Sequence, residues 1–400
     1  MEPTTATVRR KLPGSIWALG FVSLLMDTSS ELVHSLLPVL MTSVMGASVA
    51  ALGVIEGVAE AMAAVSKVFS GTISDYFRKR KALVLLGYGL SALTKPVFPL
   101  ASSLGWVFSA RFVDRIGKGI RGAPRDALVA DLVPPELRGA AYGLRQALDS
   151  VGAFAGPLLA VAGMALLADN LRGVLGIAVV PAGLCVALIF FGVREPDDAH
   201  TAAPRRRLGL ADARRLPSRF WLILALGALF TLARFSEAFL ILRAKEVGLA
   251  IGLVPLVMIV MNLVYSGAAY PAGAAADRFP PRGLLIAGLA MLIVADVLLA
   301  AARTPALAFA GAAFWGLHLA LTQGLFSKLI ADAAPSELRG TAFGVFNLVN
   351  GAALLLASVI AGALWTALGS AATFCTGAGF AALAALGLLA GRLAARPAAP

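Results

Sequence analysis

Residues 130–139 read ADLVPPELRG and residues 331–340 read ADAAPSELRG, so seven of ten positions are identical at an offset of 201. A second match, G-x-x-x-D at 71–75 and again at 273–277, has an offset of 202. Two matches at nearly the same offset indicate that one unit of roughly 200 residues occurs twice. The sequence therefore predicts two halves of the same architecture joined in tandem.

The composition places both halves in a membrane. Of the 400 residues, 59% are apolar and 14% are charged, and the mean hydropathy is +0.85. A soluble fold of this size needs a charged surface that this chain lacks, which excludes a soluble enzyme, a disordered chain and a nucleic-acid module. Cys185 and Cys375 both lie in apolar runs, so neither a disulfide framework nor a zinc site is expected.

The fold class follows from the apolar runs. Windows of roughly 20 residues, long enough to cross the ~30 Å hydrocarbon core, occur near 14–42, 49–73, 81–101, 104–127, 140–167, 172–193, 218–242, 250–275, 283–302, 305–330, 340–368 and 371–393. The runs are continuously apolar, which excludes a β-barrel. We expect an all-α membrane protein with twelve transmembrane helices in two pseudo-symmetric six-helix bundles, 1–193 and 218–400, joined by a cytoplasmic linker at 194–217.

The basic residues predict the orientation. Twenty lysines and arginines fall in the termini and in the loops on one side, against four on the other: Arg172, Arg243, Lys245 and Arg303. Both termini are therefore expected in the cytoplasm, which also explains the net charge of +12 without nucleic acid. The first run follows Arg9 and Arg10 but is too long for a signal peptide and contains Asp27, so we expect a retained span. The alanine-rich composition suggests a bacterial inner membrane.

Parallel repeats of six helices are the build of a large class of alternating-access carriers, in which the substrate binds between the halves. The stretch GTISDYFRKRK at 71–81 resembles the signature loop of the major facilitator superfamily, G-x-x-x-D-x-x-G-R-K/R, apart from Tyr76 and Arg78. Arg115, followed by Gly119, resembles the family's fourth-helix motif. The resemblance covers nearly the whole chain and implies the transporter fold, a monomer, and a cytoplasmic gate at Gly71, Asp75, Arg80 and Asp277.

Within that resemblance, Asp75 would face the start of the eleventh span near Gly340, and Asp277 would face the fifth span near Gly139. The fifth-span residues Gly152, Gly156 and Pro157 resemble part of a motif associated with exporters, without its trailing glycine pair. The same pattern is also typical of close helix packing in membranes.

Ionisable residues inside a span are costly, so each is a functional candidate. Asp27, Glu31 and His34 share one face of the first helix by their spacing. Two carboxylates one turn apart repel each other when both are ionised, so this face suits proton coupling. A divalent metal site and an internal ion pair are the alternatives, but a single helix face rarely supplies a complete metal coordination shell.

The fourth helix carries the densest charge. Arg111 and Arg115 are expected deep in the cavity, facing Asp27 and Glu31 or a substrate anion. Further expected cavity residues from several spans are Lys118, Glu56, Glu60, Arg234, Glu237, Gln323 and Asn347. Arg125 and Asp126 are expected at the cytoplasmic gate, and Arg145 is expected to pair with Asp149 four residues later. For the other polar residues within spans, such as Lys95, Asp296 and His318, we expect hydrogen bonds between helices.

These features predict a secondary transporter, not an enzyme, that exports a small anionic or amphiphilic solute by proton-coupled antiport. The chain has no phosphate-binding loop, so no ATP and no cofactor are expected, and the proton gradient supplies the energy. Expected partners are the small-molecule substrate and the lipid bilayer. The alternatives are efflux of lipophilic cations, metals or metal chelates, an integral-membrane enzyme, and a sensor on the same scaffold.

Overall fold

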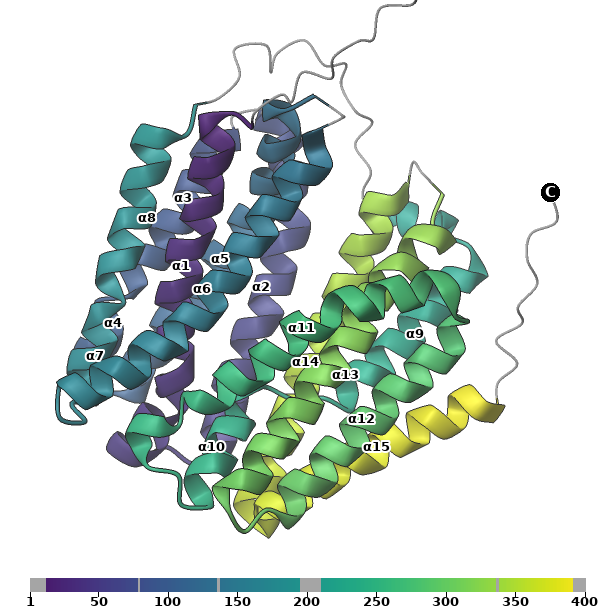
Figure 1. Cartoon of the computed structure of the whole chain (residues 1–400). Helices are drawn as coiled ribbons and strands as arrows, with labels where there is room; N and C mark the ends of the chain where they lie inside the picture. Colours follow the sequence, from purple (N-terminus) through teal and green to yellow (C-terminus); the bar gives the residue numbers. More distant parts are fainter. Residues whose placement is uncertain (1–11, 78–79, 135–136, 195–209, 336–337, 391–400) are drawn as a thin grey trace, which may run out of the picture.

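The computed structural model describes residues 12–77, 80–134, 137–194, 210–335 and 338–390. Within these ranges the chain is helical apart from turns and contains no strand. Figure 1 shows two groups of helices, with α1–α8 on the left and most of α9–α15 on the right, while α10 lies below the first group. The all-α fold class is therefore confirmed.

The helices of the first half are α1 (Gly14–Val39, extended by a π-helical turn at Leu40–Val44), α2 (Val49–Phe77), α3 (Arg80–Thr94), α4 (Val97–Leu100), α5 (Leu104–Leu132), α6 (Arg138–Leu166), α7 (Leu171–Ile177) and α8 (Val179–Gly192). Those of the second half are α9 (Ser218–Leu232), α10 (Ala238–Glu246), α11 (Leu256–Arg278), α12 (Pro281–Ala301), α13 (Pro305–Ala333), α14 (Arg339–Leu368) and α15 (Ser370–Ala390). A short 3-10 helix, Leu210–Arg215, lies in the predicted linker, of which residues 195–209 are outside the described part.

Across the described residues these helices form twelve passages, because α3–α4, α7–α8 and α9–α10 are each one interrupted span. Ten helical segments of the described chain are long and apolar enough to cross a membrane. The other two passages are α5, which is rich in charged residues, and α9–α10, where the longer piece has only 15 residues.

Two of the interruptions have different origins. The third span breaks at Lys95 and Pro96, since proline has no amide hydrogen and disfavours helical geometry in the residue before it. The seventh span was predicted to be continuous over 218–242, but it breaks between Leu232 and Ala238. There the amide of Ser236 donates to Ser358 Oγ of α14 at 3.2 Å, so a tertiary contact satisfies the freed backbone group.

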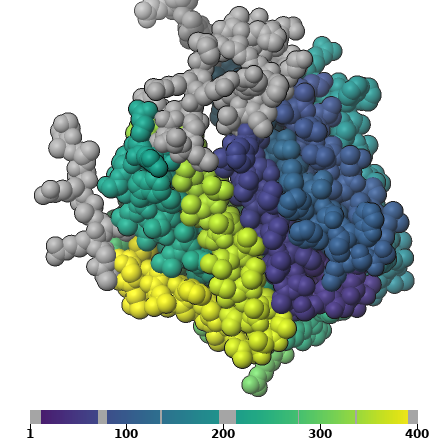
Figure 2. Space-filling view, turned by 180° about the vertical axis from the view of Figure 1, so that it is seen from behind, coloured from purple at the N-terminus to yellow at the C-terminus, as the bar shows by residue number. Residues whose placement is uncertain are grey.

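The two halves meet along α2 and α14, which lie side by side in Figure 2. Small residues allow this approach: a Cβ atom on Gly57 would lie 2.9 Å from Leu355 Cδ1, and one on Gly351 would lie 2.6 Å from Ala64 Cβ. Additional contacts close the end of the molecule where α2 begins. Ala50 donates its amide to Thr366 Oγ1 at 3.1 Å. We call this the closed end.

Within the first half, α6 packs directly against α1. A Cβ atom on Gly152 would lie 2.6 Å from Leu24 O, and one on Gly156 would lie 2.6 Å from Thr28 O. Pro157 is buried beside them in α6. These glycines therefore fix the backbone of α1 along the stretch that carries Asp27 and Glu31.

Substitution of Gly156 by leucine is expected to destabilise the protein by about 1–3 kcal/mol, because the new side chain would overlap backbone atoms that cannot rotate away. Gly143→Leu is the matched control, since it lies in the same helix and a Cβ atom there meets no atom within 4 Å. Thermal unfolding of the purified variants in detergent checks this. Equal melting temperatures for the two variants would contradict the packing role of Gly156.

Candidate functional site

A cavity of about 660 Å³ lies between the two halves. Its walls come from α1, α2, α5 and α6 on one side and from α9, α11, α13 and α14 on the other. It begins beside Asp27 and Glu31, about halfway along α1, and extends past Lys67 and Arg125 toward the ends of α2 and α5. This position between the halves and away from the closed end makes it the candidate substrate site.

The predicted proton-coupling residues lie at the inner part of this cavity. Asp27 and Glu31 line it, whereas His34 is buried next to them. His34 Nδ1 is 3.5 Å from Glu31 Oε2, and its Nε2 is 3.7 Å from Glu56 Oε2. Asp27 has no hydrogen bond or ion pair with any residue of the described chain. Of the two acids, Asp27 is thus the one that remains available to a proton or a solute.

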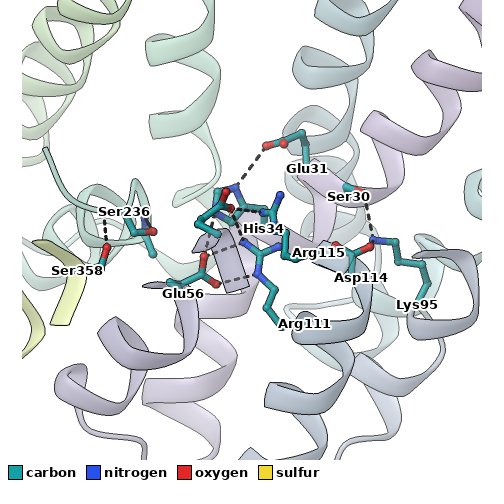
Figure 3. A network of polar contacts seen from close by, with 12 residues as sticks. Ser30, Glu31, His34, Glu56, Lys95, Arg111, Asp114, Arg115, Ser236 and Ser358 are labelled. Atoms are coloured by element: carbon teal, nitrogen blue, oxygen red, sulfur yellow. Dashed lines mark hydrogen bonds and ion pairs between the residues drawn. The ribbon is translucent and has the colours of Figure 1, made fainter. Parts of the chain in front are cut away.

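The deep arginines do not face the first-helix acids, so this prediction is wrong. Arg111 donates from Nε to Glu56 Oε1 at 3.0 Å and from Nη2 to Glu56 Oε2 at 2.7 Å, as Figure 3 shows. Arg115 Nη2 lies 3.0 Å from Glu60 Oε1. The cause is the close packing of α5 on α2, where a Cβ atom on Gly119 would lie 2.6 Å from Ala63 O.

The ion pairs divide the expected cavity residues into two groups. Glu60 and Lys118 line the cavity, together with Arg234, Gln323 and Asn347 from the second half. Other expected residues, Glu56, Arg111, Arg115 and Glu237, lie outside its lining. Glu56 and Arg111 are each 1% exposed, so their charges satisfy each other inside the first half and leave the solute to other groups.

A second buried pair joins three helices of the first half. Lys95 Nζ lies 2.9 Å from Asp114 Oδ1 and donates to Ser30 Oγ at 3.1 Å. Figure 3 places this pair beside the Glu56–Arg111 pair, on the side away from Ser236. The expected interhelical hydrogen bond of Lys95 is confirmed, and its position at the break of the third span ties that break to α1 and α5.

Charged residues also connect the helices toward the ends of α2 and α5. Arg125 donates to Ser23 Oγ at 3.0 Å and to Tyr88 OH at 3.1 Å, and it lies 3.4 Å from Asp126. The predicted pair of Arg145 and Asp149 is confirmed at 2.9 Å.

The signature-loop residues are only partly described. Arg80 pairs with Asp131 and donates to Ala127 O at 2.8 Å, which holds the start of α3 to α5. Gly71 and Asp75 lie in α2 and Asp277 lies in α11. The predicted contacts of their side chains lie outside the described residues.

Besides Arg234, the second half contributes neutral polar groups to the cavity wall. Tyr265 OH donates to Gln323 Oε1 at 3.1 Å, and both line the cavity with Asn347 and Asn350. His318 Nδ1 lies 2.8 Å from Gly288 O, so the expected interhelical hydrogen bond of this histidine is confirmed.

Asp296 contradicts the expectation of a satisfied hydrogen bond. Its side chain is fully buried in α12, and neither carboxyl oxygen has a partner in the described chain. Its nearest neighbours include Gly377, where a Cβ atom would lie 2.7 Å from Asp296 Oδ2 and 3.2 Å from Phe235. The position of a polar residue within a span therefore did not predict a partner for Asp296.

Three aromatic rings of the cavity wall were missed by the sequence analysis: Phe230, Phe326 and Phe346. Phe326 contacts both of the others: its ring centroid lies 5.0 Å from that of Phe230, edge to face, and 5.9 Å from that of Phe346, at a tilt of 35°. A phenylalanine in an apolar span gives no signal that separates a cavity wall from a lipid-facing surface. Among the described residues, no group of three or more histidine, cysteine, aspartate or glutamate side chains could hold a metal ion.

The sequence of this chain is similar to those of known membrane transport proteins. A sequence model described as the Major Facilitator Superfamily matches residues 19–244 and 235–400. An uncharacterised transporter of this type from Methanocaldococcus jannaschii is 32% identical over 367 residues, which is 89% of each chain. The class C tetracycline resistance protein of Escherichia coli is 26% identical over 291 residues, covering 70% of this chain and 72% of that protein.

A solved structure has the same fold. A bacterial homologue of the human lysosomal transporter Spinster, in an inward-facing and unoccupied conformation, matches with a TM-score of 0.77. The match covers 95% of this chain and 97% of that one at 15% identity, so it supports the fold alone.

Proposed function

Since this chain belongs to the major facilitator superfamily, we propose that it is a proton-coupled antiporter that exports a small amphiphilic solute. The family and the fold make it a multi-pass membrane transporter, not an enzyme. The observation that carries the proposal is Asp27, an unpaired carboxyl group on the cavity wall between the two halves.

The other acids of the cavity wall are occupied. Glu31 approaches His34, Glu60 pairs with Arg115, and Asp149 pairs with Arg145. Among the acidic residues of the cavity wall in the described chain, only Asp27 has no partner and can therefore exchange a proton with the cavity. Antiport requires that the proton and the solute exclude each other, and a donor group of the solute at Asp27 would meet this requirement.

The direction of transport is part of the proposal. The cavity extends toward the ends of α2 and α5, which the positive-inside pattern assigns to the cytoplasm. A solute would therefore enter from the cytoplasm, and a proton arriving from outside would displace it. The similarity to a tetracycline resistance protein is consistent with export.

Efflux of a cation or a metal chelate is the second candidate, because a lone carboxylate facing a cavity also suits a positive solute. Everted membrane vesicles with an imposed proton gradient and a pH-sensitive dye distinguish the two. Organic anions, amphoteric compounds, lipophilic cations and metal chelates are added in turn. The proposal expects collapse of the gradient with an amphoteric or anionic compound. Collapse only with cations or chelates would favour the second candidate, and no collapse with any compound would reject proton antiport of these solutes.

A further inference from the structure

The cavity wall carries more positive charge than its acids balance. Lys67, Lys118 and Arg234 all line the cavity, and none of them has a hydrogen bond or ion pair from its side chain to a residue of the described chain. Arg121 also lines it, and its partners are neutral: Ser91 Oγ at 2.6 Å and the ring of Tyr88 at 4.5 Å. The one unpaired acid of the wall, Asp27, neutralises a single positive charge.

Lys118 is held in place by the packing of α5. A Cβ atom on Gly117 would lie 2.8 Å from Ser91 Oγ of α3, and one on Gly119 would lie 2.5 Å from Ser66 Cβ of α2. The helix is thus wedged between two neighbours by the glycines on either side of Lys118. The lysine itself points into the cavity and is exposed there. An unpaired cation on so constrained a backbone is well prepared to bind a ligand.

Arg234 provides a second positive charge, from the other half of the molecule. It lies in the break between α9 and α10, so its position depends on a short non-helical segment. That segment is anchored by the bond from the Ser236 amide to Ser358 Oγ. A ligand that contacts both Lys118 and Arg234 would connect the two halves across the cavity.

We infer that the cavity binds a doubly negative oxyanion, a dicarboxylate or a phosphate monoester group, between Lys118 and Arg234. Two negative charges match the two cations Lys118 and Arg234 themselves, and Asp27 leaves the wall with enough positive charge for such a group because Lys67 and Arg121 also line it. Arg234 presents a donor fork suited to carboxylate or phosphate oxygens. The inference rests on the proposed function, because the dianion is taken to be the acidic group of the same solute that the transporter exports. The solute is then amphoteric, with a donor group at Asp27 and an acidic group at Lys118 and Arg234.

Binding is measured on the purified full-length protein in detergent without a proton gradient. The probes are malonate for dicarboxylates and phenyl phosphate for phosphate monoesters, with acetate at equal ionic strength as the singly charged comparison. We expect one of the two dianions to bind at least tenfold more tightly than acetate. Lys118→Gln and Arg234→Gln should each weaken that binding by about tenfold or more, the effect of losing one charge-assisted hydrogen bond.

Control variants separate the site from general electrostatics and from misfolding. Arg303→Gln removes an exposed positive charge outside the cavity and should leave binding unchanged. Lys118→Arg and Arg234→Lys keep the charge and should retain most of the affinity. The inference is overturned if neither dianion binds better than acetate, or if Arg303→Gln weakens binding as much as the two cavity variants.

Dianion binding and vesicle transport, both measured with Asp27→Asn as well, separate this inference from the proposed function. Asp27→Asn should keep dianion binding, because it removes a negative charge from the site. If dianions fail to bind while vesicles still exchange another solute for protons, the anion site is wrong and proton antiport stands. If dianions bind while Asp27→Asn leaves gradient-driven flux intact, the anion site stands and the coupling role of Asp27 is wrong.

Discussion

Vesicles that contain the Asp27→Asn variant are expected to lose solute transport driven by a proton gradient. Asparagine has nearly the same shape as aspartate but cannot exchange a proton, and Asp27 has no ion pair in the described chain that the change would break. The folded protein should therefore remain, and solute exchange without a gradient should continue. The expected loss is complete, to the level of vesicles without the protein.

The matched control for Asp27→Asn is the same substitution at an acidic residue outside the cavity. Asp169 is exposed near the closed end, and asparagine tolerates its backbone φ of 60°. Asp169→Asn should transport like the original protein. Gradient-driven flux with an unchanged pH dependence in Asp27→Asn would show that the coupling proton binds elsewhere.

Loss of either partner in the Glu56–Arg111 pair is expected to have the largest effect on stability. The two side chains form a bidentate pair, with distances of 3.0 and 2.7 Å, and are each 1% exposed. Removing one partner leaves a buried charge without compensation, which costs about 3–5 kcal/mol. Glu56→Leu and Arg111→Met alone should therefore each yield little folded protein.

The double variant Glu56→Leu with Arg111→Met tests the cause. Replacement of both charges by apolar side chains leaves no unpaired ion, so most of the lost stability should return. The charged side chains next to the pair keep an ion-pair partner in the double variant, because His34 still contacts Glu31 and Arg115 still contacts Glu60. Thermal unfolding of detergent extracts checks this, and a double variant as unstable as either single variant would contradict the account.

The sequence predicts the fold and most of the polar residues near the cavity, because apolar run length and helical spacing are local properties. It does not predict which helices face each other. Arg111 and Arg115 were assigned to the acids of the first helix, but Gly119 brings α5 against α2, and Glu56 and Glu60 are therefore nearer.

Other features depend on tertiary contacts in the same way. The stretch from Ala233 to Glu237 contains neither proline nor glycine, so nothing local marks the break in the seventh span. The break is stabilised by Ser358, more than a hundred residues away. The burial of Asp296 without a partner is likewise set by what α15 places beside it, which helical spacing within α12 does not reveal.

Accessibility of the cavity from each side of the membrane tests alternating access most directly. Asn347 lines the cavity from α14 and is replaced by cysteine in a Cys375→Ser background, where the remaining Cys185 is buried. Labelling uses a membrane-impermeant maleimide on intact cells and on everted vesicles, with and without a proton gradient. We expect labelling from the cytoplasmic side at rest and increased labelling from the outside when a gradient is imposed, an increase that Asp27→Asn removes. Labelling from one side only under every condition would contradict a cavity that opens to both sides in turn.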